Sequence, residues 1–187
     1  MKRFLLALTL LVVFTGQSYA QCAPQVPVRV YLMYGLLSSL MSSGMSDLVD
    51  KLNRIPNVKA TVHEWVSSGS IAEDAAKQNA AVVFGGHSIG ANAAVSIAHQ
   101  LNGKRRVALI LGYDPSSLAG LESVPPNVDR AIGFRQDHNP FGGNTLVAAA
   151  PGTSVQNQFH DMNHIAIDKH AKIHAASIAA ICAISSR

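Results

Sequence analysis

The segment Gly86-His87-Ser88-Ile89-Gly90 has the pattern in this chain that most clearly indicates a catalytic residue. A serine hydroxyl acts as a nucleophile when the backbone exposes it on a sharp turn and a base lies within reach. The segment follows an apolar run at residues 81–84 and precedes an alanine-rich pattern at residues 89–101. This is the strand–turn–helix setting that a G-x-S-x-G nucleophile requires, so we expect Ser88 to be the nucleophile. A phosphate-binding turn is the alternative, but the segment lacks the lysine of a P-loop.

Apolar runs that predict strands alternate along the chain with segments that predict helices. The predicted strands are at residues 28–34, 58–65, 80–84, 107–111, 131–134 and 145–149, and the predicted helices are at residues 46–55, 70–78, 89–101 and 165–184. Ser70 and Glu73 form a capping box at the start of the second helix. Strands without a polar face that alternate with helices predict a parallel sheet covered on both sides. The expected fold is a three-layer α/β/α sandwich on a mostly parallel sheet of about six strands.

With this order of elements, the motif around Ser88 resembles the nucleophile elbow of the α/β-hydrolase superfamily, in a small lipase- or esterase-like form. The resemblance covers nearly all of the chain after residue 20. It implies a chain order of serine, then acid, then histidine, and it implies no cofactor. The loop at residues 114–128 is too short for a cap domain, which favours an open site and a minimal version of the fold.

The resemblance places the catalytic histidine on a late loop just before the last helix. His164 occupies that position, and His160, four residues earlier, is the alternative. We expect His170 and His174 to lie on a partly exposed face of the final helix.

Two aspartates are candidates for the acid that orients this histidine. Asp114, in Gly112-Tyr113-Asp114-Pro115, resembles the Gly-x-Asp-Pro segment of some lipases. Asp137 follows the next predicted strand, which is the more common position in the superfamily. We favour Asp114 and leave Asp137 open.

The resemblance also implies an oxyanion hole of two backbone N–H groups, from Leu36 after the first strand and from Ile89 directly after Ser88. Family members often carry His-Gly before the first donor, whereas this chain has Tyr34-Gly35. Trp65, at the end of the second predicted strand, is either a packing residue or part of a substrate pocket.

The string His160-Asp161-Met162-Asn163-His164 is close to the H-E-x-x-H pattern of zinc peptidases. Such a site needs both imidazoles on one helix face, a third ligand and a carboxylate base. The string lies between a predicted strand and a predicted helix, and no third ligand stands out, so we expect no metal site.

Residues 1–20 have the features of an export signal. Lys2 and Arg3 precede an apolar run that is shorter than the roughly 20 residues needed to span a bilayer, and Ser18-x-Ala20 is a cleavage motif. We therefore expect a signal peptide at 1–20, one domain at 21–187, and a periplasmic or extracellular protein without a stable membrane span. In an exported chain the pair Cys22 and Cys182 favours a disulfide.

Removal of residues 1–20 lowers the formal net charge from +4 to +2, because Lys2 and Arg3 are the charged residues lost. The short run Lys104-Arg105-Arg106 is typical of a solvated turn, so we expect no nucleic-acid partner. The sequence thus predicts a secreted serine hydrolase that cleaves small-molecule or lipid acyl esters. A thioesterase of narrow specificity and a non-catalytic binding protein of the same fold are the alternatives.

Overall fold

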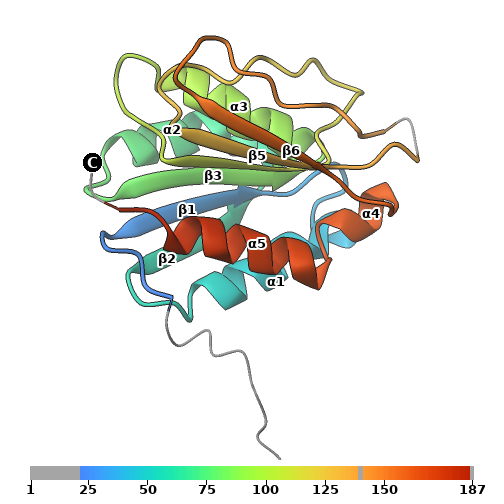
Figure 1. Ribbon diagram of the computed structural model, residues 1–187, viewed down its shortest axis with the longest axis horizontal. Helices are drawn as coiled ribbons and strands as arrows, with labels where there is room; N and C mark the ends of the chain where they lie inside the picture. Colours follow the sequence, from blue (N-terminus) through green and yellow to red (C-terminus); the bar gives the residue numbers. More distant parts are fainter. Residues whose placement is uncertain (1–21, 139–140, 186–187) are drawn as a thin grey trace, which may run out of the picture.

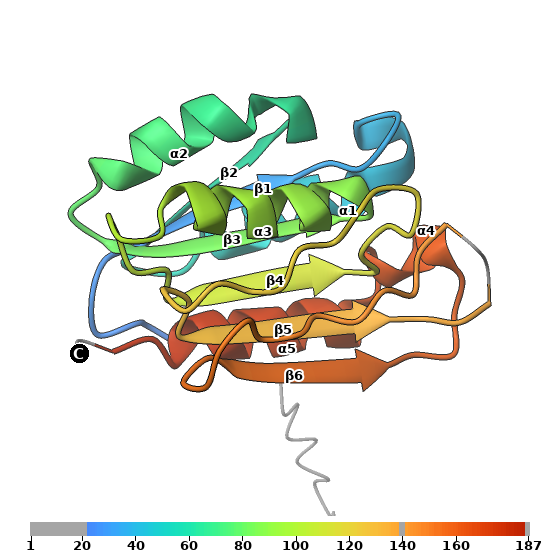
Figure 2. The same ribbon diagram turned by 90° about the horizontal axis from the view of Figure 1, so that it is seen from above.

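A computed structural model describes residues 22–138 and 141–185. A six-stranded sheet lies at its centre, with the strand order β2-β1-β3-β4-β5-β6. The strands are β1 (Val28–Met33), β2 (Val58–His63), β3 (Ala81–His87), β4 (Leu109–Tyr113), β5 (Arg130–Arg135) and β6 (Ser154–Phe159). All five neighbouring pairs are parallel, so every strand ends at the same edge of the sheet (Figure 2).

Helices cover both faces of this sheet (Figure 1). They are α1 (Ser39–Leu52), the 3₁₀ helix η2 (Trp65–Ser67), α2 (Ser68–Ala76), α3 (Ile89–Gln100), α4 (His164–Ile167) and α5 (Ala171–Cys182). Helices α1 and α5 pack on one face in a core that includes Met45, Leu48 and Ile181. Helices α2 and α3 pack on the other face in a core that includes Ile71, Val95 and Phe84. The predicted three-layer α/β/α sandwich is confirmed.

The sixth strand is not where the sequence predicts it. Residues 145–149 form only an isolated bridge between Ala148 and Val124, and the edge of the sheet is instead β6. Leu146 is buried in the core. The side-chain amide of Asn157 in β6 accepts a hydrogen bond from the backbone N–H of Leu146 (3.0 Å) and donates one to the backbone carbonyl of Leu146 (2.9 Å). A side chain thus satisfies the polar groups that a neighbouring strand would otherwise bond.

Three helix predictions are also wrong at their ends. Helix α1 begins at Ser39, seven residues before the predicted start, and it contains a kink at Ser42. Ser70 does not cap α2, because its hydroxyl donates to the carbonyl of Ser67 from inside the helix. The predicted final helix is two helices, α4 and α5, and the chain between them is fixed by side-chain bonds to Asp168.

The two cysteines at the ends of the described chain are bonded to each other. A disulfide joins Cys22 to Cys182, whose Cα atoms are 5.5 Å apart. In the described residues no helix is long and apolar enough to cross a membrane. The predicted signal peptide, residues 1–20, lies outside the described residues.

Candidate active site

Ser88 lies on a sharp turn between β3 and α3. Its backbone has φ 57° and ψ −125°, a left-handed conformation that is costly for a residue other than glycine. The turn brings Gly86 against the first turn of α3, since a Cβ on Gly86 would lie 2.4 Å from the carbonyl carbon of Gly90. Gly86 is therefore required by the close approach of strand and helix. Gly90 is required by the end of β1, since a Cβ on it would lie 2.5 Å from the carbonyl oxygen of Tyr34.

The backbone of this turn is bonded to the end of the neighbouring strand β4. The N–H of Ser88 donates to the carbonyl of Tyr113 at 2.9 Å, and Asp114 follows directly. Asp114 also has a positive φ, 50°. The two left-handed residues therefore sit side by side at the carboxyl edge of β3 and β4.

The carboxylate of Asp114 is fully buried and accepts four hydrogen bonds. Oδ2 lies 2.6 Å from Nδ1 of His164 and 2.8 Å from Nε2 of Gln136. Oδ1 accepts from the backbone N–H groups of Gln136 (3.2 Å) and Gly143 (2.7 Å). Burial by itself raises the pKa of this carboxyl, but the bonds from His164, Gln136 and Gly143 lower the pKa below its usual value. Asp114 is thus held as a carboxylate.

His164 is the first residue of α4 and is 6% exposed. Asn163 caps this short helix by accepting from the N–H of Ala166 at 2.9 Å. The imidazole of His164 lies against that of His87, the neighbour of Ser88, with ring centroids 4.5 Å apart. The structure therefore brings Asp114 and His164 into direct contact, beside the turn that carries Ser88.

The other candidates lie elsewhere. Asp137 is exposed on the loop after β5. His160 lies at the end of β6 with its ring 5.9 Å from that of Phe134. His174, predicted to lie on a partly exposed helix face, is instead buried, with Nε2 2.5 Å from the carbonyl of Asp168 and Nδ1 2.8 Å from Nζ of Lys51.

The structure separates the two histidines of the zinc-like string, because His160 follows a strand and His164 begins a helix. Within residues 22–138 and 141–185 no group of three or more His, Cys, Asp or Glu side chains is arranged to hold a metal ion.

Leu36 and Ile89 lie on the two sides of the turn. Gly35 packs against Ser88, since a Cβ on it would be 3.0 Å from the Cβ of Ser88, and Leu36 is the next residue. Ile89 is the first residue of α3, so its N–H belongs to the group of helix-start donors without a partner in the helix. Trp65 begins η2 and is half-buried.

Sequence reasoning missed two buried residues at this site, Gln136 and His87. Gln136 supplies two of the four donors to Asp114. Its position two residues after the predicted strand at 131–134, at the same edge as Asp114, is the signal that could have found it. His87 could have been found from its place inside the serine motif.

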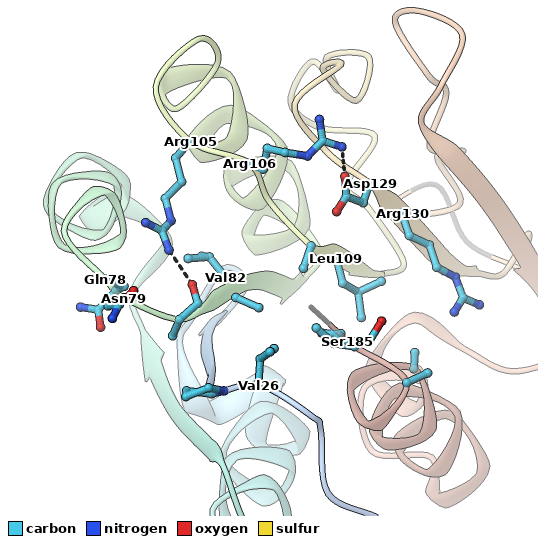
Figure 3. A pocket seen from close by; sticks show the side chains of 17 residues that line it. Val26, Gln78, Asn79, Val82, Arg105, Arg106, Leu109, Asp129, Arg130 and Ser185 are labelled. Atoms are coloured by element: carbon cyan, nitrogen blue, oxygen red, sulfur yellow. Dashed lines mark hydrogen bonds and ion pairs between the residues drawn. The ribbon is translucent and has the colours of Figure 1, made fainter. Parts of the chain in front are cut away.

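Among the described residues, one cavity borders His164 and another lies at the opposite edge of the sheet. One of about 430 Å³ is lined by His164 and its neighbours Asn163, Ile165, Ala166 and Lys169. The other, of about 740 Å³, lies at the opposite edge of the sheet, near the amino ends of β3, β4 and β5 (Figure 3). There Arg105 donates to the carbonyl of Ala80 and Arg106 pairs with Asp129. The first cavity, not the second, adjoins His164.

No family model matches the sequence, and no curated protein matches it either. Solved structures do match. Human thioesterase 2 superposes with a TM-score of 0.62 at 10% identity, over 86% of this chain and all of that one. LipS and LipT, metagenome-derived lipolytic enzymes, are represented by a match with a TM-score of 0.52 at 14% identity, over 85% of this chain and 95% of that one.

A protein from Xanthomonas campestris pv. campestris, assigned to the alpha/beta superfamily of hydrolases, superposes with a TM-score of 0.50 at 15% identity, over 82% of this chain and 95% of that one. This chain has the α/β-hydrolase fold. At such low identities the likeness establishes the fold alone. In an α/β-hydrolase fold the carboxyl edge of the parallel strands is where ligands bind, and it is the edge that carries Ser88, Asp114 and His164.

Proposed function

We propose that this protein is a serine hydrolase that cleaves acyl esters through an acyl-enzyme, with Ser88 as nucleophile, His164 as general base and Asp114 as the acid that orients it. The observation that carries the proposal is the 2.6 Å contact between Asp114 Oδ2 and His164 Nδ1, next to the strained turn of Ser88. Nδ1–H donates to the carboxylate, which leaves Nε2 unprotonated and able to accept a proton.

In the first half of the reaction, Oγ of Ser88 attacks the ester carbonyl carbon while Nε2 of His164 takes the hydroxyl proton. The backbone N–H groups of Leu36 and Ile89 stabilise the oxyanion that forms. The imidazolium then gives its proton to the departing alcohol, and the acyl group remains on Ser88. In the second half, water attacks this ester with His164 again as base, and the acid product leaves.

The surroundings of Ser88 favour a substrate with an apolar acyl group. Of the nine large hydrophobic residues that are exposed among the described ones, eight lie at the end of a strand or on a segment that follows one, at the carboxyl edge of the sheet. These are Leu36, Leu37, Leu40, Val66, Leu118, Phe141, Phe159 and Ile165. Leu36 and Leu37 directly follow Gly35, which packs against Ser88, so apolar surface is present beside the proposed nucleophile.

Export of the protein is a further part of the proposal. The disulfide between Cys22 and Cys182 supports it, because such bonds persist in oxidising compartments and are rare in the cytosol.

The test is turnover by residues 21–187 of p-nitrophenyl esters from acetate to octanoate, with acyl-coenzyme A thioesters of the same lengths in parallel. We expect ester turnover that survives a chelator, rises with acyl length, and falls about 10³-fold or more in Ser88→Ala. Ser70→Ala, at an exposed position in α2, is the control and should keep the turnover of wild type. Turnover of the thioesters alone would assign the thioesterase alternative, and no turnover of either class would favour the binding-protein alternative.

A further inference from the structure

His87 lies inside the serine motif but is not a member of the proposed triad. It is 1% exposed, and its two ring nitrogens bond to two separate segments. Nδ1 lies 2.8 Å from Oγ of Ser42 in α1, and Nε2 lies 2.9 Å from the backbone carbonyl of His164. A single buried imidazole therefore joins α1 to the start of α4.

The partners fix where the protons of this chain of bonds lie. A carbonyl oxygen only accepts, so Nε2–H of His87 donates to His164. Nδ1 of the neutral ring is then an acceptor, and the Ser42 hydroxyl donates to it. Burial lowers the pKa of His87 to about 4, with a smaller contribution from His164, so the ring is neutral at neutral pH.

Ser42 extends this chain to the loop that follows β1. Its Oγ accepts from the N–H of Gly35 at 3.0 Å, and the side chain is fully buried. The backbone at Ser42 has φ −119° and ψ 33°, which interrupts α1. The kink therefore occurs at the residue whose hydroxyl bonds both Gly35 and His87.

We propose that Ser42 and His87 are positioning residues that hold the oxyanion loop and the catalytic histidine in register with Ser88. The inference rests on the proposed function. The chain runs from Gly35, the residue before the oxyanion donor Leu36, through Ser42 and His87 to the backbone of His164. His87 is also the residue before Ser88. The buried hydrogen bonds thus join the oxyanion loop to His164, and the peptide bond between His87 and Ser88 joins both to the nucleophile. The side chains of Ser42 and His87 are themselves buried.

The first test removes the hydroxyl at the middle of the chain. Ser42→Ala should lower kcat by about 10- to 100-fold with KM changed by less than about twofold, because a misplaced donor and base weaken the transition state and not substrate binding. Ser42→Thr, which keeps a hydroxyl, should recover most of the loss. His87→Gln can place its amide N–H near the position of Nε2, toward the His164 carbonyl, but has no acceptor at the position of Nδ1 for the Ser42 hydroxyl, so its kcat should lie between those of wild type and His87→Ala.

Ser177→Ala is the matched control. Ser177 is also fully buried and makes two hydrogen bonds, to Tyr113 (2.7 Å) and to the carbonyl of Ile173 (2.9 Å), but in the core under α5. It should lose stability as Ser42→Ala does while its kcat stays within about twofold of wild type. If Ser42→Ala and Ser177→Ala lower the unfolding temperature alike and neither lowers kcat, Ser42 is merely structural and the inference is overturned.

The second test does not depend on turnover. Nitrogen NMR of the histidines should show His87 protonated on Nε2 alone at neutral pH, and the His164 Nδ1–H resonance should shift in Ser42→Ala but not in Ser177→Ala. A proton on Nδ1 of His87, or a His164 Nδ1–H resonance that is unchanged in Ser42→Ala, would overturn the inference. An inactive wild type with the expected NMR pattern would instead count against the proposed function alone.

Discussion

Asp114, at the end of β4, contacts His164, and the segment after β5 holds the Asp114 carboxylate in place by hydrogen bonds. Oδ2 of Asp114 is 2.6 Å from Nδ1 of His164, while Gln136 and Gly143 from the later loop donate three hydrogen bonds to the same carboxylate. The loop in which the superfamily more often places its acid thus provides donors here. Asp137, in that loop, is exposed.

This arrangement predicts that Asp114→Asn and Asp137→Asn differ greatly. An asparagine in place of Asp114 cannot hold the imidazole in the tautomer that leaves Nε2 free, so kcat should fall by about 10⁴-fold, whereas Asp137→Asn should stay within about threefold of wild type. Steady-state kinetics on one ester, with thermal unfolding to verify folding, compares the two. Equal losses, or a larger loss for Asp137→Asn, would assign the acid to Asp137.

Gly142 predicts a steric effect on the same pair. A Cβ added there would lie 2.0 Å from Oδ2 of Asp114 and 2.6 Å from Nδ1 of His164, so Gly142→Ala must displace one of them. We expect kcat to fall by about 100-fold, the cost of a misplacement of roughly 1 Å. Gly120→Ala is the matched control, because nothing lies within 4 Å of its Cβ position. Equal kcat values for the two variants would contradict the prediction.

Asp168 predicts a pH dependence of stability. Burial raises the pKa of this carboxyl from 3.8 to about 6, and its Oδ1 has no hydrogen-bond partner. Between pH 4 and 6 the folded state therefore binds more protons than the unfolded state, so this group makes the free energy of unfolding fall as the pH rises through that window. Asp168→Asn should flatten the fall and stabilise the protein at pH 7 by about 1–2 kcal/mol.

Urea unfolding at intervals from pH 4 to pH 8 measures both effects for Asp168. An unchanged slope in the variant, or a loss of stability at pH 7, would show that the charged carboxylate is not disfavoured in the fold.

The disulfide predicts a large loss of stability without a loss of activity. It joins residues 160 positions apart, and Cys182 ends α5 at the edge of the sheet opposite Ser88. Cys22→Ala/Cys182→Ala should lower the free energy of unfolding by about 2–5 kcal/mol, with kcat unchanged at temperatures where the variant is folded. Denaturant unfolding and ester kinetics together check this, and a fall in kcat of the folded variant would link the bond to the site.

Elements with buried apolar faces could be predicted from the sequence, and those fixed by polar contacts could not. Strands β3 and β4 are apolar runs, and their predicted ends agree with the structure within about three residues. Strand β6 reads Ser-Val-Gln-Asn-Gln-Phe and lies at the edge of the sheet, where polar side chains face solvent. The more apolar residues 145–149 resemble a strand, but Asn157 bonds Leu146 in place of a strand partner.

The same distinction applies to the site. Ser88 stands out because its motif is local. The resemblance to the superfamily favours Asp114 by its Gly-x-Asp-Pro segment and His164 by its place before the last helix, but it leaves Asp137 and His160 open. The bonds of His87 to Ser42 and of Gln136 to Asp114 join residues 45 and 22 positions apart. Such contacts depend on tertiary packing, for which no periodic pattern in the sequence exists.

The most direct test of the central claim is to trap the acyl group on Ser88. Wild-type protein is mixed with a p-nitrophenyl ester, quenched in acid during the first turnovers, and measured by intact mass and peptide mapping. We predict a burst of p-nitrophenol, one acyl group per chain on the peptide that contains Ser88, and neither signal in Ser88→Ala. Turnover that continues in Ser88→Ala, or an acyl group mapped to another residue, would contradict the serine mechanism.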